Sequence, residues 1–229
     1  QVLIPTGPAL DLDVPNTTDA VGYAWAILEY RLCVLPPEHL TFIAPHGGRR
    51  MIVEGGQTIL VLPPGYRVGT TLADQLEFAL RYDGVNLQVL DALFRRIDRD
   101  VFEREVAQHV EERPTGQYVR RLWFLYEFLT GHKVPVADAS TGNYVPLLDP
   151  QTYYTTPGTR SRRHRVVDNL LGSADFCPII RRTDCLRDFE AAGLANEASR
   201  IVSNFDEDTI RRAVSYLYTK ETRSSFDIE

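Results

Sequence analysis

Residues 118–129 constrain the fold of this chain more than any other segment. Apolar side chains there cover nearly every face of a helix, where most helices of globular proteins carry a single apolar stripe. A helix of this kind is buried on most sides and usually stands at the centre of a bundle. Gly131 follows as a suitable C-cap. We therefore predict a mainly α fold around a central helix whose apolar residues are Tyr118, Leu122, Trp123, Leu125, Tyr126, Phe128 and Leu129.

Further helices are predicted on both sides of this segment. Thr17 or Thr18 provides an N-cap for a helix over residues 19–33. The sequence Thr-Leu-Ala-Asp at residues 71–74 has the pattern of a capping box and opens a helix that reaches about Tyr82. Apolar spacing and capping residues predict the remaining helices over residues 87–97, 101–112, 183–203 and 207–229, the last with Asp206 as its cap.

Short strands are predicted between the first two helices. Three apolar, β-branched runs at 40–43, 51–53 and 58–62 are separated by glycine pairs. We expect a small antiparallel β meander near residues 40–62, beside a helical bundle, and hence an α+β class. The expected division is an N-terminal arm, helix and meander over residues 1–69, and a helical region over residues 70–229.

Residues 134–182 lack a long helical or strand period and contain five prolines. An irregular connection of this length in a compact domain either carries function or packs irregularly against neighbouring elements. We expect it to pack across the helical bundle.

Composition excludes several classes of protein. Hydrophobic residues make up 44% of the chain, which excludes a disordered or collagenous chain. The net charge of −6 argues against a dedicated non-specific nucleic-acid binder. Three cysteines without metal-type spacing predict a reducing, cytoplasmic setting and no metal site. The longest apolar stretch is too short and too interrupted to span a bilayer, so no membrane partner is expected.

Four arginines within six residues form the most concentrated basic segment: Arg160, Arg162, Arg163 and Arg165. Arginine presents a rigid fork of donors that matches phosphate, so the segment is a candidate phosphate-binding site. No aromatic residue lies between these arginines, which argues against stacking on single-stranded nucleic acid. The alternative is a solvated turn whose arginines pair with acidic groups of the protein surface.

The last helix carries the second candidate site. Ser225 and Glu229 lie four residues apart, on one face of a helix. Negative charge at a helix C-terminus is unfavourable by a few tenths to about 1 kcal/mol. Either the helix continues in a longer parent, or a cation meets Glu229. The chain starts at Gln1 without an initiator methionine and stops at Glu229, so we expect a fragment.

Residues 217–229 resemble the inhibitory helix of Fic-family proteins, which typically transfer AMP from ATP to a hydroxyl side chain of a target protein. The family's inhibitory motif is Ser or Thr, three residues, Glu, then Gly or Asn. Ser225 and Glu229 match its first two fixed positions. The segments 142–150, 161–165 and 176–183 also resemble the region that precedes this helix in large bacterial Fic proteins, so the likeness covers roughly residues 118–229.

The resemblance implies a regulatory part without a catalytic centre. The family signature is His-Pro-Phe, an acidic residue, Gly-Asn-Gly-Arg and a second Arg, and this chain has none of it. We therefore expect no catalytic residue and no cofactor in this chain. ATP and Mg would be bound by the parent enzyme. Glu229 would pair with the second Arg and block the ATP γ-phosphate, and Ser225 would fix the helix position.

The partner implied is a Fic catalytic core, in cis or in trans, and the target protein stays unknown. Two alternatives remain open at this point. One is a stand-alone, antitoxin-like inhibitor that acts in trans on a separate Fic enzyme. The other is an unrelated protein-binding or nucleic-acid-binding module that uses residues 160–165.

Overall fold

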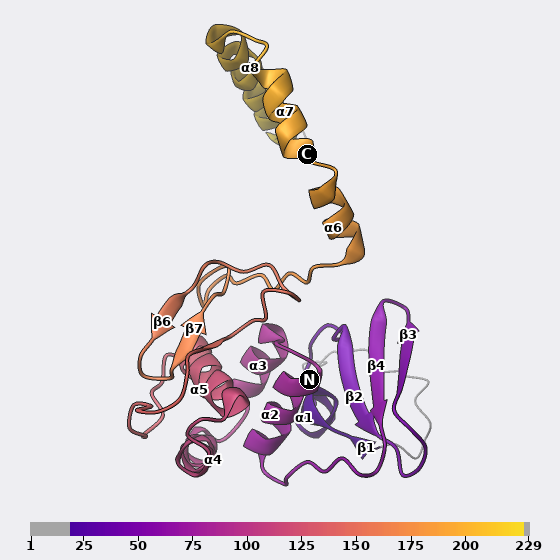
Figure 1. The fold of residues 1–229 in the computed structure, drawn as a ribbon, viewed down its shortest axis with the longest axis vertical. Helices are drawn as coiled ribbons and strands as arrows, with labels where there is room; N and C mark the ends of the chain where they lie inside the picture. Colours follow the sequence, from indigo (N-terminus) through magenta and orange to yellow (C-terminus); the bar gives the residue numbers. More distant parts are fainter. Residues whose placement is uncertain (1–18, 227–229) are drawn as a thin grey trace, which may run out of the picture. The chain divides into compact units, whose positions relative to one another are not determined.

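The computed structural model describes residues 19–226, with side chains up to Lys220. They form two compact units that divide after Arg181 (Figure 1). The described helices of unit 1 are α1 (Gly22–Glu29), α2 (Leu72–Tyr82), α3 (Leu87–Phe94), α4 (Arg99–Glu112) and α5 (Gln117–Thr130). Unit 2 contains α6 (Asp184–Ala191), α7 (Leu194–Val202) and α8 (Glu207–Phe226). The mainly α, α+β class predicted from the sequence is confirmed.

The central helix is α5, as its apolar pattern predicts. It packs against α2, α3 and α4. The side chains of Trp123 and Leu125 are fully buried, and Gly131 ends the helix in the left-handed conformation, with φ 71°. The hydrophobic core continues from Tyr23 in α1 to Leu170, close to the end of unit 1. The boundary expected between residues 69 and 70 thus falls inside a unit with one continuous core.

The first helix is shorter than predicted. It begins at Gly22, because Asp19 and Ala20 form the short strand β1 (Asp19–Ala20), which pairs antiparallel with the strand that ends at Ile43. The predicted caps Thr17 and Thr18 lie outside the described residues. The capping box of α2 is confirmed: the Thr71 hydroxyl accepts from the Asp74 amide, and the Asp74 carboxylate accepts from the Thr71 amide.

The three predicted strands exist as β2 (His39–Ile43), β3 (Arg50–Glu54) and β4 (Gln57–Leu62), but the antiparallel meander is wrong. The strand order is β1-β2-β4-β3, with β2 parallel to β4 and β3 antiparallel to β4. The loop after β2 passes one strand position, so the more apolar β4 lies inside the sheet. The outer strand β3 exposes Met51 and Val53 and carries Arg50 and Glu54 at its ends, which suits an edge.

The irregular connection contains a second small sheet, of β5 (Val145–Pro146), β6 (Thr159–Ser161) and β7 (Val166–Asp168). Its order is β5-β7-β6, with β5 parallel and β6 antiparallel to β7. Leu147, Val166 and Leu170 are buried in the core that α5 organises. The connection therefore packs on the helical bundle, as expected.

Unit 2 differs from its prediction at one point. The single helix expected over residues 183–203 is two helices, because Gly193 adopts a left-handed conformation, with φ 65°, between α6 and α7. Asp206 caps α8 as predicted, since its carboxylate accepts from the Thr209 amide at 2.9 Å. Ser225 lies in α8, and Glu229 lies outside the described residues. Among the helices that the structure describes, none combines the length and apolar character needed to cross a membrane.

Candidate functional site

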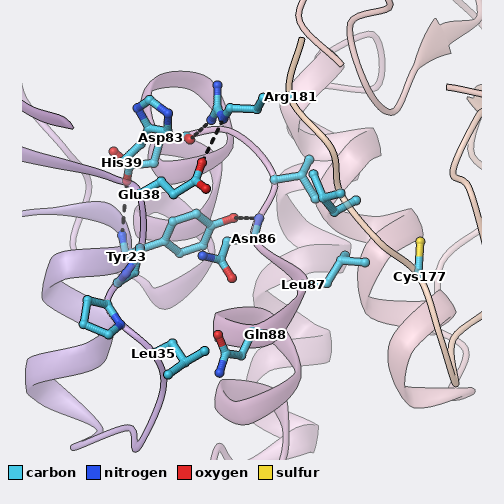
Figure 2. Close-up of a pocket in the computed structure, with 14 residues that line it drawn as sticks. Tyr23, Leu35, Glu38, His39, Asp83, Asn86, Leu87, Gln88, Cys177 and Arg181 are labelled. Carbon is cyan, nitrogen blue, oxygen red and sulfur yellow. Dashed lines mark hydrogen bonds and ion pairs between the residues drawn. The ribbon is translucent and has the colours of Figure 1, made fainter. Parts of the chain in front are cut away.

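The candidate site of unit 1 is a cavity of about 360 Å³, called here the first cavity (Figure 2). Four segments distant in sequence line it: Tyr23 of α1, the entry to β2 at residues 35–39, the α2–α3 turn at residues 83–88, and residues 177–181. The turn brings backbone very close to side chains. A Cβ at Gly84 would lie 2.3 Å from the Tyr153 hydroxyl, so only glycine fits there.

Arg181 connects the walls of the first cavity. Its Nη2 atom donates to the carbonyl oxygen of Asp83 at 2.9 Å, and its Nε atom lies 3.9 Å from the Glu38 carboxylate. The guanidinium carbon stands 4.8 Å from the centre of the Tyr153 ring. Figure 2 shows this side chain reaching between Asp83 and Glu38, with Cys177 on the far wall. Arg181 is thereby held in place by hydrogen bonding, charge and ring stacking together.

A second cavity, of about 260 Å³, lies beside the first and shares His39, Asp83 and Arg181 with it. Arg121 of α5 contributes to its lining. The Nε atom of Arg121 donates to the Pro146 carbonyl oxygen at 2.9 Å, and burial lowers the pKa of its guanidinium. Among the side chains of residues 19–220, no carboxylate forms an ion pair with Arg121. A half-buried guanidinium without a direct ion pair among the described side chains, on which the charge of Asp149 acts only from a distance, is thus part of this cavity.

Asp83 is buried at the point where α1, α2 and β2 meet. Its carboxylate accepts from the Thr41 hydroxyl at 2.5 Å and from the Tyr23 amide at 3.5 Å. Burial raises the pKa of this carboxyl to about 7, although both hydrogen bonds and the charge of Arg181 act in the opposite direction. At neutral pH the group therefore carries only part of a negative charge.

The remaining titratable groups of the first cavity favour binding over covalent chemistry. Burial, and then the charge of Arg181, lowers the pKa of His39, so the imidazole is neutral. Burial raises the pKa of the Cys177 thiol, which disfavours the thiolate that a nucleophile requires. In the described part of the chain, no three His, Cys, Asp or Glu side chains form a group that would hold a metal ion. The arrangement presents cations and hydrogen-bond donors without an activated nucleophile.

The predicted arginine cluster is not gathered into one site. Arg163 forms a bidentate pair with Glu127, with its Nη2 atom 2.8 Å from Oε1, and its Nη1 atom also contacts Asp138 at 2.8 Å. Arg165 donates to backbone carbonyls of the 139–142 segment. These are the contacts of structural residues that fasten the irregular connection to α5. Arg160 and Arg162 are exposed, and Arg160 stacks over a tyrosine ring.

A hydrogen-bonded chain around Glu127 has no signal in the sequence. The Ser161 hydroxyl lies 2.7 Å from His164 Nδ1, and His164 Nε2 lies 3.1 Å from the Glu127 carboxylate. This order resembles a nucleophile, a base and an orienting acid. Glu127, however, is already paired with Arg163 and accepts a hydrogen bond from the Trp123 indole, and His164 is buried outside both cavities. The geometry fits a structural network.

Comparison of the chain with protein-family models, with curated proteins and with solved structures found no match. We therefore infer the function of the chain from the geometry within each unit and from the sequence resemblance. Sequence reasoning assigned no role to Arg121, which belongs to no motif, or to Arg181, which lies in the segment 176–183 that contributes only to the resemblance. They lie sixty residues apart in the sequence and line the same cavity only because the connection packs on α5.

Proposed function

We propose that this chain is an N-terminal regulatory and scaffold module of a Fic-type protein AMP-transferase. Its unit 2 would be the part that meets the catalytic core. One observation of the structure supports this proposal: apolar side chains of unit 2 are exposed to solvent in all three helices. The large ones include Leu186, Phe189, Leu194, Ile201, Val202, Val214 and Leu217, with exposed fractions from 37% to 60%, and Phe205 between α7 and α8 is exposed as well.

The spacing of these residues gives each helix an apolar face. Leu194, Ile201 and Val202 recur at intervals of seven and eight residues along α7, and Val214 and Leu217 are three apart on α8. No residue of α6 or α7 is buried. Extended exposed apolar surface in a folded protein marks a site of interaction with another macromolecule. A helical partner domain is therefore the occupant that we propose, and the sequence resemblance points to a Fic core.

The resemblance also supplies the chemistry. In the proposed complex the Glu229 carboxylate pairs with the second Arg of the family signature, whose fork would otherwise bind the ATP γ-phosphate. The same carboxylate repels the triphosphate. ATP then cannot place its α-phosphate in line with the attacking hydroxyl, and AMP transfer stops. ATP and Mg are bound by the core, and Ser225 fixes the position of α8.

The test mixes this chain with a purified Fic catalytic core that lacks its own inhibitory helix. Auto-AMPylation is measured with labelled ATP. We expect the intact chain to suppress the reaction and Glu229→Gly to relieve the suppression. Glu221→Gly is the matched control, since it makes the same substitution eight residues earlier in the sequence, within α8. Equal suppression by the intact chain and by Glu229→Gly would contradict the inhibitory role.

The docking face is tested separately by pull-down of the core. Leu217→Asp should weaken the association, because it places a charge in the apolar face. Ser215→Asp introduces the same charge at another exposed position of α8 and should leave association unchanged. Equal binding of both variants would show that the apolar face of α8 is not the contact.

A further inference from the structure

We propose that the second cavity of unit 1 binds phosphate, either as the free anion or as the phosphate group of a small organic molecule. The proposal concerns a different unit and different residues from the inhibitory helix. It goes beyond the proposed function and does not depend on it. The cavity, of about 260 Å³, has room for a phosphate with a small substituent.

Three arginines line this cavity, and each stacks on a tyrosine that also lines it. The guanidinium carbons lie 4.8 to 5.4 Å from the centres of these rings. Stacking fixes the planes of the guanidinium groups, so little side-chain entropy is lost when they bind a ligand. The pairs are Arg81 with Tyr82, Arg121 with Tyr118, and Arg181 with Tyr153.

Within the part of the chain that the structure describes, the acidic groups of the second cavity form no direct ion pair with these cations. The charge of Asp149 nevertheless acts on Arg121, and that of Arg181 acts on Asp83. The Asp149 carboxylate accepts from the Gln151 amide at 3.0 Å and from the Thr152 hydroxyl at 2.8 Å. The Asp83 carboxylate is held by Thr41 and the Tyr23 amide and is only partly ionised at neutral pH. Among residues 19–226, neither carboxylate forms an ion pair with an arginine of the cavity.

Arg121 is the partly buried arginine of the second cavity that has no ion pair in the described part of unit 1. Its Nε atom donates to a backbone carbonyl, which leaves both terminal nitrogens without a hydrogen-bond partner in the described chain. A charge removed from water needs a compensating partner, otherwise its burial is costly. Arg181 likewise uses one terminal nitrogen, on the Asp83 carbonyl, and its nearest carboxylate, that of Glu38, is largely exposed. An anion in the cavity would satisfy both forks.

Phosphate is the anion that matches this arrangement best. A guanidinium fork donates two parallel hydrogen bonds to two oxygens of a phosphate, and two forks can share one tetrahedral anion. The Tyr118 and Tyr153 rings provide apolar walls for a substituent on the remaining oxygen. The groups that line the cavity contain no activated nucleophile, so we assign binding without chemical conversion.

The experiment titrates the full chain with inorganic phosphate and with phenyl phosphate by isothermal calorimetry, at constant ionic strength set with sodium chloride. We expect saturable binding at one site. Arg121→Gln and Arg181→Gln should each weaken it by about tenfold or more, the loss expected for a hydrogen bond to a charged group. Tighter binding of phenyl phosphate would assign an organic ligand, and tighter binding of inorganic phosphate the free anion.

Arg95→Gln is the matched control, because Arg95 is an exposed arginine of unit 1 that pairs with Asp91 away from the second cavity. Arg81→Gln is a second test of the lining that should leave the protein folded, since the Arg81 side chain is exposed and its removal leaves the core intact. It should also weaken the binding of phosphate. Circular dichroism establishes that each variant is folded. No saturable binding by the intact chain, or an affinity of both the Arg121→Gln and the Arg181→Gln variant equal to that of the intact chain, would overturn the proposal.

Discussion

The two units of the chain hold their helices in different ways. In unit 1, α5 has fully buried side chains, among them Trp123, and packs against three other helices. In unit 2, α6 and α7 have no buried residue. Helix formation there depends on interactions between residues that are close in the sequence. The Thr183 hydroxyl caps α6, and Arg211 pairs with Glu207 four residues earlier on α8.

The difference in burial between the two units predicts that unit 1 determines the stability of the fold and that unit 2 determines association with a partner. Tertiary packing supplies most of the stability of a helix in a globular protein, and isolated short helices are marginal in water. Substitutions in unit 1 should therefore change the free energy of unfolding. Substitutions on the apolar faces of unit 2 should change binding to a partner and leave the unfolding of unit 1 unaltered.

The largest effect is expected when one large aromatic side chain is removed from each unit, which tests the contrast in burial between them. Trp123→Ala should destabilise unit 1 by about 3–5 kcal/mol, because it leaves a cavity in the core. Phe189→Ala, at a position that is 60% exposed in α6, should change stability by less than about 0.5 kcal/mol. Urea denaturation followed by circular dichroism measures both. Similar losses for the two variants would contradict the contrast between the units.

The second prediction concerns the pH dependence of unit 1. The folded pKa of Asp83, about 7, lies above the ordinary value of 3.8, so the folded state holds a proton that the unfolded state has lost. Stability should therefore fall as pH rises from about 4 to about 7, by roughly 3–4 kcal/mol in total from this group. Asp83→Asn should remove this fall, as measured by urea denaturation across that range. A dependence as steep as in the unaltered chain would exclude Asp83 as its source.

His109 provides an internal comparison for this pH effect. Its imidazole contacts Glu77 and lies 3.6 Å from Asp74, and the hydrogen bond to Glu77 raises the pKa of His109. Its contribution to stability is complete below the unfolded pKa of about 6.5 and is lost as pH rises through the higher folded value. His109→Gln should therefore alter the dependence only above about pH 6.5, in a window distinct from that of Asp83.

The third prediction concerns the network around Glu127. Its carboxylate accepts from Trp123, Arg163 and the Val134 amide. Glu127→Gln should cost about 2–3 kcal/mol, because hydrogen bonds to a charged acceptor are lost. Glu197→Gln makes the same change at an exposed position of α7 and should be close to neutral. Thermal unfolding of the two variants compares them directly, and equal midpoints would refute a structural role for Glu127.

The smallest effect is expected at the start of α8. Asp206→Ala removes the N-cap and should cost about 1 kcal/mol locally. Hydrogen exchange should become faster in the first turn of α8, while exchange in α5 stays unchanged. Asp208→Ala removes an acidic residue of the same turn without removing the cap and should have a smaller effect. Faster exchange in α5 as well would mean that the stability of unit 1 depends on this cap.

Sequence reasoning succeeded where the signal is local. The pattern of α5, the capping box at Thr71 and the cap at Asp206 each involve neighbours within a few residues, and all three are present. The positions of β2, β3 and β4 also follow from short apolar runs. Their pairing does not, because glycine pairs are compatible both with a hairpin and with a loop that passes one strand position.

The candidate cavity escaped prediction for the same physical reason. Arg121 and Arg181 line one cavity only after the irregular connection has packed on α5, and no local pattern encodes that arrangement. The segment 160–165 is a candidate phosphate-binding site in the sequence because it contains four arginines within six residues. The structure shows instead that Arg163 and Arg165 bind the protein's own carboxylates and carbonyls. A high density of arginines in a sequence is thus a weaker indication of an anion-binding site than an arginine whose side chain has no ion pair in the folded structure.

The order of the first sheet has a consequence for how unit 1 folds. The strands β3 and β4 are joined by a two-residue turn at Gly55 and Gly56, and a hairpin of this kind forms within about 1–10 μs. The parallel pairing of β2 with β4 has no such local closure, because the chain between these two strands contains the whole of β3. We therefore expect the hairpin to form first and to dock on β2 as a preformed piece, so that docking limits the folding rate of the sheet.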